Sequence, residues 1–256
     1  MTARALVTGA SSGIGETFAR RLAARGNHLV VVARREDRLH ALAAELASAR
    51  IDVEVLPADL LTDEGLATVE RRLAAPEQPV DLLVNNAGFG ITGTFAESPL
   101  ERDLAMVELN VVALVRLTRA GLVAMAERGS GAIVNLSSLA GFQAVPSTAV
   151  YAATKAFVTS FTEAVAEEAR GSGVRLQALC PGLTRTEFHE VNAFDVGWLP
   201  DAAWQSAGQV VDASLNALES GRVVVVPGAL NRMTAAMSWL TPRALRRRLV
   251  GVAVRR

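Results

Sequence analysis

The stretch Arg4-Ala-Leu-Val-Thr-Gly9-Ala-Ser-Ser-Gly13-Ile-Gly15-Glu16 decides the fold. Its first five residues are typical of a short buried strand, and apolar residues then recur at helical spacing through Leu22. The glycines allow a tight turn, and the helix N-terminus offers free N–H groups and a positive dipole end to a pyrophosphate. The spacing Gly-x-x-x-Gly-x-Gly differs from the usual dinucleotide pattern Gly-x-Gly-x-x-Gly, so an ordinary loop is the alternative interpretation.

The second predicted strand, residues 28–32, ends in Ala33-Arg34-Arg35. At this place in a nucleotide-binding βαβ unit an acidic residue binds the ribose 2′-hydroxyl, whereas arginine accommodates a 2′-phosphate. Arg34 and Arg35 therefore favour NADP(H) over NAD(H). A solvated turn is the alternative, and the nearby Asp37 leaves the preference open.

Short strands and helices alternate along most of the chain. Further strands are predicted at residues 52–56, 81–84, 131–137, 174–179 and 222–226, with helical patterns between them and one long helix from about 100 to 128. This alternation predicts an α/β fold, a single-domain Rossmann-like doubly wound parallel sheet with helices on both faces, over residues 1–228. The chemically suggestive residues fall at the ends of strands, which indicates a ligand at the carboxyl edge of the sheet.

Tyr151 and Lys155 are the only tyrosine and the only lysine of the 256 residues. Four residues apart on a helix they share a face, so the ammonium can approach the phenol hydroxyl. A phenol with a pKa near ~10 is a poor proton shuttle at neutral pH. A unit charge at about 4 Å, in an effective dielectric of about 20, lowers that pKa by about three units. The alternative is a Tyr-x-x-x-Lys pair on a helix surface that has no function.

Two further polar positions need an explanation. Asn110 lies inside the long helical pattern, where asparagine is mildly unfavourable and needs a partner or a purpose. Ser138 follows the fifth predicted strand, and Ser137 before it is interpreted as an ordinary serine at the end of a strand.

Together these residues resemble the short-chain dehydrogenase/reductase family in its compact single-domain branch, over roughly residues 4–227. Thr8-Gly9 with Gly13 and Gly15 resembles the coenzyme turn of that family. Asn85-Asn86-Ala87-Gly88 resembles the motif that stabilises the central sheet. The resemblance matches the catalytic tetrad to Asn110, Ser138, Tyr151 and Lys155. It implies that the coenzyme is bound by Gly9, Ser11, Ser12, Gly13, Ile14, Gly15, Arg34, Arg35, Asp59, Leu60, Asn86, Ala87, Gly88, Tyr151, Lys155, Pro181, Gly182, Leu183 and Thr186.

The resemblance implies hydride transfer between nicotinamide and a carbonyl carbon, with Tyr151 giving or taking the proton on oxygen. Ser138 would hydrogen-bond the carbonyl oxygen. Lys155 would lower the pKa of Tyr151 and bind the nicotinamide ribose. Asn110 would hold, through its helix backbone, a water on the proton path, and Asp59 would contact the adenine ring.

Residues 183–205 are expected to form an apolar lid over the substrate. Phe188, Val191, Phe194, Val196, Trp198 and Leu199 lie in this segment, although several of them would equally suit a plain core. Phe89, Ile91, Phe95, Phe142 and Val145 are candidates for the other walls. No basic cluster accompanies the lid except Arg185, so the expected substrate is an apolar ketone, aldehyde or secondary alcohol.

Composition narrows the setting of the protein. Half of the residues are hydrophobic, the mean hydropathy is +0.27 and the formal net charge is zero, which suits one globular domain. The single Cys180 excludes an internal disulfide, the three histidines lack metal-ligand spacing, and no signal peptide is recognised. A cytoplasmic protein with no metal and no nucleic-acid partner is expected.

Residues 229–256 extend beyond the last predicted strand and carry arginines and apolar residues at roughly helical spacing. This basic amphipathic extension suits a peripheral contact with an anionic membrane, or a helix packed on its own or a neighbouring subunit. The resemblance implies a homodimer or homotetramer through the helices at 99–128 and 149–170. Two other classes of function stay open: a non-catalytic NADP(H)-sensing protein and a membrane-surface scaffold on the same fold.

Overall fold

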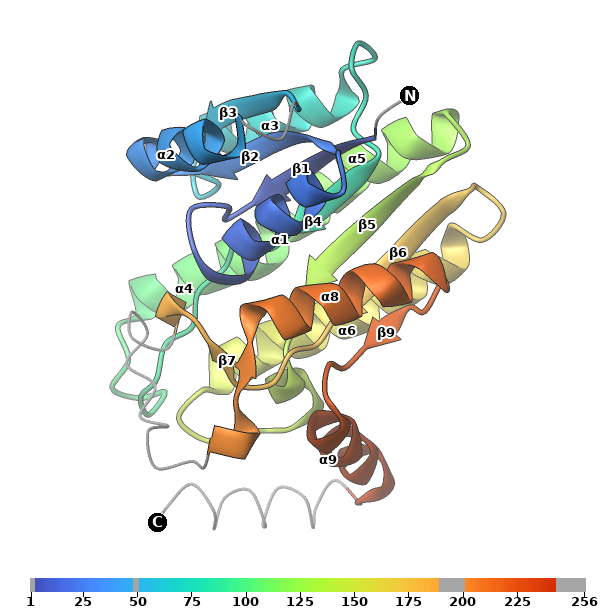
Figure 1. The fold of residues 1–256 in the computed structure, drawn as a ribbon. Helices are drawn as coiled ribbons and strands as arrows, with labels where there is room; N and C mark the ends of the chain where they lie inside the picture. The colour runs from blue at the N-terminus through green and yellow to red at the C-terminus, as the bar shows by residue number, and fades with distance from the viewer. Residues whose placement is uncertain (1–2, 48–50, 189–200, 243–256) are drawn as a thin grey trace.

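The fold is a seven-stranded parallel sheet between two layers of helices (Figure 1). The computed structural model describes residues 3–47, 51–188 and 201–242. The strands lie in the order β3-β2-β1-β4-β5-β6-β9, and every adjacent pair is parallel. Their bounds are β1 Arg4–Thr8, β2 His28–Ala33, β3 Val53–Pro57, β4 Leu82–Asn85, β5 Gly131–Leu136, β6 Val174–Leu179 and β9 Val224–Val225. The predicted fold class is therefore confirmed.

The strands are apolar on both faces because helices cover both. In β2, Leu29 and Val31 join one core, and Val30 and Val32 join the other. The first core is completed by α1 (Gly13–Ala24), α2 (Glu36–Leu46) and α8 (Ala207–Glu219), and the second by α3 (Asp63–Ala74), α5 (Leu114–Glu127) and α6 (Ala149–Glu168). Such strands read as continuous hydrophobic runs, which is typical of parallel sheets.

The strand order reverses between β1 and β4, which are neighbours in the sheet although two strands separate them in sequence. The connections leave the carboxyl ends of these strands in opposite directions, and this opens a crevice there. The glycine turn follows β1 and the loop from Asn86 follows β4, so both predicted ligand-binding loops lie at this point of the sheet.

The long helix predicted from 100 to 128 is interrupted at its middle. The structure has α4 (Leu100–Val107), a π-helical segment (Glu108–Ala113) and then α5. Asn110 lies in the π segment, 1% exposed. A π turn inserts one residue per turn and turns a side chain to a new direction, and such turns often mark functional sites.

The span Leu100–Glu127 is also long and apolar enough to cross a membrane by length and composition, with a mean hydropathy of 1.5. In the structure α5 packs against α3 and β5, and Leu117 and Met125 belong to the second core. A helix packed in a protein core has the same apolar composition as a membrane-spanning helix, so this span is weak support for membrane insertion.

The remaining short elements lie near the carboxyl edge of the sheet. They are a 3₁₀ turn (Leu139–Phe142), the two-stranded ladder of β7 (Thr184–Arg185) and β8 (Gln205–Ser206), a 3₁₀ turn (Asp201–Ala203) and α9 (Ala229–Leu240). The last strand was predicted over 222–226 but comprises two residues, because β9 pairs only with the end of β6 at the edge of the sheet.

Candidate active site

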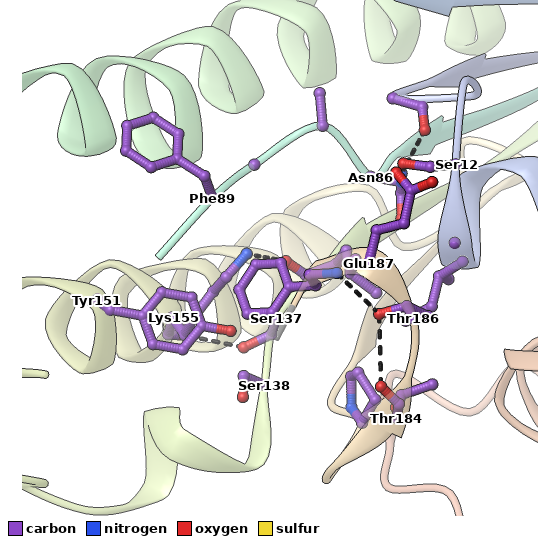
Figure 2. A pocket seen from close by; sticks show the side chains of 18 of the residues that line it. Ser12, Asn86, Phe89, Ser137, Ser138, Tyr151, Lys155, Thr184, Thr186 and Glu187 are labelled. Carbon is purple, nitrogen blue, oxygen red and sulfur yellow. Dashed lines mark hydrogen bonds between the residues drawn. The ribbon is translucent and has the colours of Figure 1, made fainter. Parts of the chain in front are cut away.

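A cavity of about 1090 Å³ lies at the carboxyl ends of the strands. Its lining runs from the glycine turn after β1 through the loops after β2, β3, β4 and β5 to Pro181 after β6. Figure 2 shows Tyr151, Lys155 and Ser138 near one another and Ser12, Thr186 and Glu187 farther along the same cavity. The glycine turn and the proton-transfer candidates therefore share one space.

The glycine turn is held in place by the loop after β4. The Asn86 side-chain amide donates to the backbone oxygens of Thr8 (2.9 Å) and Gly9 (3.3 Å), and the Thr8 hydroxyl accepts from the backbone N–H groups of Asn86 and Ala87, both at 3.0 Å. A Cβ on Gly15 would lie 2.3 Å from the Gly9 oxygen. A side chain there would separate the turn from the helix, so the close approach requires glycine.

The N-terminus of α1 faces the cavity. Gly9 and Gly13 have φ values of +65° and +57°, in the left-handed region that favours glycine. Ser12 is the N-cap, and its side chain makes no cap hydrogen bond. Ser12, Gly13 and Ile14 line the cavity, so the first N–H groups of the helix can receive an anion. The cradle fits the pyrophosphate of a dinucleotide, because the first N–H groups and the positive dipole end of α1 face it.

The two predicted phosphate-binding arginines differ in their contacts. Arg34 is exposed and makes no hydrogen bond or ion pair with a described residue. Arg35 reaches across the turn, where its Nε and Nη2 donate to the Ser11 hydroxyl (3.1 and 3.0 Å). Its Nη1 lies 3.3 Å from a carboxylate oxygen of Glu187. Both arginines line the cavity beside the turn, as a 2′-phosphate site requires.

Tyr151 and Lys155 lie one turn apart on α6 and both are buried. The Lys155 ammonium donates to the backbone oxygen of Leu136 (2.8 Å) and lies 5.8 Å from the centroid of the Tyr151 ring. Ser138 accepts from the Ala140 N–H (3.1 Å) and hydrogen-bonds with Tyr151. Three of the four predicted tetrad residues thus meet at the end of β5.

The pKa values correct one expectation from the sequence. Burial raises the pKa of Tyr151 to about 12, and the hydrogen bond with Ser138 offsets only part of this. Burial also lowers the pKa of Lys155 to about 8. The pKa of the phenol is therefore raised and not lowered as expected, because the sequence argument included the charge of Lys155 and omitted desolvation by burial. At neutral pH Tyr151 is a protonated phenol, the form that donates a proton.

Asn110 lies beneath the loop after β4 and does not line the cavity. Its side-chain amide donates to the Phe89 oxygen (2.9 Å), and its side-chain oxygen accepts from the Phe89 N–H (3.1 Å). A Cβ on Gly88 would lie 2.7 Å from that same oxygen. The π turn thus directs Asn110 to hold the Gly88–Phe89 backbone against the site, a contact that sequence reasoning did not foresee.

Ser137 is buried and structural, in agreement with its interpretation from the sequence. Its hydroxyl lies 2.7 Å from the Lys155 backbone oxygen and 2.7 Å from the Thr159 hydroxyl, which joins the end of β5 to α6. A Cβ on Gly141 would lie 2.8 Å from the backbone carbon of Lys155. These contacts fix Lys155 relative to Ser138 through backbone packing.

Almost all predicted coenzyme residues line the cavity. The exception is Gly15, which lies under the turn. Asp59 lines it with its carboxylate accepting from the Leu61 N–H (3.0 Å). Among the predicted walls, Phe89, Val145 and Phe188 line the cavity; Phe95 is 64% exposed, and with Ile91 it lies outside, as does Phe142. The apolar lid residues 191–199 lie outside the described residues.

Several cavity residues were not predicted. Glu187 and Arg102 line it, and so do Leu230, Asn231 and Thr234 of α9. The Asn231 amide donates to the Gln205 side chain (2.8 Å) and the Pro227 oxygen (2.9 Å), and a Cβ on Gly182 would lie 2.6 Å from it. The start of the C-terminal extension therefore belongs to the site. The feature of the sequence that indicates this role is the polar Asn231 within an apolar helical pattern.

In the described part of the chain, no group of three or more His, Cys, Asp or Glu side chains could hold a metal ion. Cys180 is buried, and burial raises the pKa of its thiol to about 11. Neither observation points to metal or thiol chemistry among these residues.

Comparisons with known proteins agree on one family. A family model described as short chain dehydrogenase matches residues 3–195. Sulfoacetaldehyde reductase 2 of Chromohalobacter salexigens is 40% identical over 188 residues, which is 72% of this chain and 73% of that protein. A short-chain dehydrogenase from Sphingobium yanoikuyae, solved in complex with NADPH, is 37% identical with a TM-score of 0.84 and covers 94% of this chain and 97% of its own. The bulky-bulky ketone specific alcohol dehydrogenase of Comamonas testosteroni is 34% identical with a TM-score of 0.79, covering 94% and 96%.

The burial of Lys155 predicts a specific dependence of stability on pH. Lowering its pKa from 10.5 to about 8 corresponds to roughly 3 kcal/mol against folding with a charged ammonium. Above pH 8 the folded chain loses this proton while the unfolded chain keeps it, so the free energy of unfolding rises with pH. We expect wild type to gain about 2 kcal/mol relative to Lys155→Met between pH 7 and pH 10, measured by urea denaturation. If the free energy of unfolding changed equally with pH in the two proteins, Lys155 would not be a buried ammonium with a lowered pKa.

Proposed function

Because the chain belongs to the short-chain dehydrogenase/reductase family and is an oxidoreductase of that family, we propose that it transfers a hydride between NADP(H) and an apolar carbonyl compound or secondary alcohol. One observation carries this proposal: the Tyr151–Ser138–Lys155 group and the glycine turn at the N-terminus of α1 line the same cavity. A protein that only senses the coenzyme, or a scaffold, has no use for a phenol paired with a hydroxyl inside that cavity.

In the proposed reaction the residues position the carbonyl and handle its proton. The Ser138 hydroxyl, already within hydrogen-bond reach of the phenol, holds the carbonyl oxygen beside Tyr151. Tyr151, protonated at neutral pH, gives its proton to that oxygen. Bound NADPH supplies the hydride. Lys155, fixed by the Leu136 oxygen, keeps a positive charge beside the phenol ring below about pH 8 and stabilises the phenolate that remains.

Removal of the phenol hydroxyl tests the role of Tyr151. We expect Tyr151→Phe to lower kcat for carbonyl reduction by about 100-fold or more, since positioned acid–base groups contribute roughly 10²–10⁴-fold. The Kd for NADPH should stay within about twofold, because the phenylalanine keeps the packing of α6. Stopped-flow reduction and fluorescence titration give the two values. A variant that keeps more than about a tenth of wild-type kcat would remove Tyr151 from the chemistry.

The coenzyme preference is proposed from Arg34 and Arg35. The NADPH-bound Sphingobium yanoikuyae relative supports it, and the exposed guanidinium of Arg34 suits a phosphate. We expect Arg34→Ala to raise the Kd for NADPH about tenfold or more and to leave that for NADH within about twofold, because a charge-assisted hydrogen bond contributes about 1.5–3 kcal/mol. Arg119→Ala, an exposed arginine of α5 outside the cavity, is the matched control. An equal loss for both coenzymes would contradict the preference.

The substrate proposal rests on the walls near Tyr151. The Phe188 ring lies 5.8 Å from the Tyr151 ring, and Phe89, Val145 and Leu230 line the same cavity. The Comamonas testosteroni relative, described as specific for bulky-bulky ketones, supports a neutral substrate, whereas the Chromohalobacter salexigens relative is described as a reductase of sulfoacetaldehyde. Arg102, which also lines the cavity, is the observation that favours a charged substrate.

A panel of carbonyl compounds distinguishes these two substrate classes. We expect kcat/KM for bulky neutral aryl or alicyclic ketones to exceed that for sulfoacetaldehyde by about tenfold or more, because burying an anion without a buried partner is unfavourable. Arg102→Ala should leave the neutral substrates unaffected. Faster turnover of sulfoacetaldehyde that is lost in Arg102→Ala would establish the charged class instead.

A cytoplasmic location and assembly into a homodimer or homotetramer remain proposals. Leu104, Val112 and Phe157 on the predicted dimer helices are exposed in the single chain, which supports assembly there. Most arginines of the C-terminal extension lie in residues 243–256, outside the described part, and nothing in the comparisons supports a membrane contact.

A further inference from the structure

Glu187 contacts Arg35, one of the two arginines proposed to bind the coenzyme phosphate, and the neighbouring Arg38. It follows β7 and lines the cavity. One carboxylate oxygen lies 3.3 Å from Nη1 of Arg35, and the other lies 2.7 Å from Nη1 of Arg38. The hydrogen bond with Arg38, assisted by Arg35, lowers the pKa of Glu187, so its carboxylate is ionised at neutral pH.

The position of this carboxylate matches that of an anionic ligand. Arg35 also donates to the Ser11 hydroxyl of the glycine turn, and Thr186 lies against the turn, 3.2 Å from a Cβ built on Gly13. The segment from Thr186 to Phe188 therefore contacts the coenzyme turn in two ways: Thr186 lies beside Gly13, and Glu187 is linked to Ser11 through Arg35. Carboxylate and phosphate oxygens accept from a guanidinium with the same geometry, so the two anions compete for Arg35.

The next residue along the chain contacts the proposed proton donor. The Phe188 ring packs on Tyr151 with 5.8 Å between centroids and 45° between planes, a usual geometry for an aromatic pair. Neighbouring residues in one short segment therefore touch the phosphate-binding arginines and the phenol.

We propose that Glu187 is a specificity-determining residue: it occupies the arginine site until a coenzyme 2′-phosphate displaces it, and that displacement moves Phe188 relative to Tyr151. The proposal rests on the NADP(H) function proposed above and adds to it a coupling between the adenosine end and the catalytic end of the cavity. NAD(H), which lacks the 2′-phosphate, leaves Glu187 in place.

The ion pairs of Glu187 with Arg35 and Arg38 are weak enough for a phosphate to replace the carboxylate. The side chains of Glu187, Arg35 and Arg38 are 41%, 42% and 45% exposed. Ion pairs this exposed are individually weak because water screens them. A phosphate with up to two negative charges and three acceptor oxygens can therefore displace a single carboxylate.

Binding of coenzyme fragments tests the competition. Adenosine 2′,5′-bisphosphate carries the 2′-phosphate, and 5′-AMP does not; neither carries nicotinamide. By calorimetry, Glu187→Gln should tighten adenosine 2′,5′-bisphosphate about three- to tenfold and leave 5′-AMP within twofold, since removing a screened ion pair changes a binding free energy modestly. Asp201→Asn is the matched control, because it breaks the exposed Arg185–Asp201 ion pair in the region after β7 without touching Arg35.

The single tyrosine of the chain provides the readout of coupling. Ring-¹³C tyrosine labelling gives one signal, that of Tyr151. We expect adenosine 2′,5′-bisphosphate to shift this signal in wild type and 5′-AMP to leave it unchanged, although neither fragment carries the ring that approaches Tyr151. In free Glu187→Gln the signal should already lie near the shifted position, and in Asp201→Asn it should behave as in wild type.

The outcomes separate the two proposals. If adenosine 2′,5′-bisphosphate binds more tightly than 5′-AMP but the tyrosine signal does not move, the coupling is wrong and the NADP(H) preference stands. If Glu187→Gln does not tighten the bisphosphate, the competition is wrong. If the two fragments bind wild type equally, the 2′-phosphate site is not at these arginines, and both proposals fail.

Discussion

The structure depends on the contact between the glycine turn after β1 and the loop after β4. These parallel strands are neighbours although β2 and β3 separate them in sequence, and Asn86 joins the two loops by donating to the backbone oxygens of Thr8 and Gly9. Gly15 permits this approach, since any Cβ there would strike the Gly9 backbone. The N-terminus of α1 is thereby aimed into a space whose far side is built from α6. The proposed coenzyme binding and proton transfer both depend on this one juxtaposition.

Burial sets the chemistry at the other end of the cavity. Tyr151 and Lys155 are both nearly inaccessible to water, and desolvation moves the pKa of each toward its neutral form. The result is a protonated phenol beside an ammonium that titrates near pH 8, which suits donation of a proton to a carbonyl oxygen. Ser137, Gly141 and Asn110 fix the backbone that carries Lys155, Ser138 and the loop after β4.

The two ends of the cavity are joined by a short segment as well as by the sheet. Thr186 lies at the glycine turn, Glu187 on the arginines and Phe188 on the Tyr151 ring. The start of α9 closes another side through Asn231, which packs on Gly182. Segments far from the coenzyme turn in sequence therefore form walls of the cavity.

The sequence by itself determined the parallel sheet and predicted most of the coenzyme residues that line the cavity. Strand positions followed from continuous apolar runs, which a parallel sheet buried on both faces requires. The glycines, the arginines, Tyr151 and Lys155 were predicted from their local chemistry, and Ser138 from the family resemblance. Only the tertiary structure decided the rest. The π turn at Asn110, the raised pKa of Tyr151, the contact of Glu187 with Arg35 and the place of α9 in the wall all depend on burial or on partners distant in sequence. The spacing of residues along the chain specifies neither the burial of a side chain nor its distant partners, because both arise only once the helices and strands have packed.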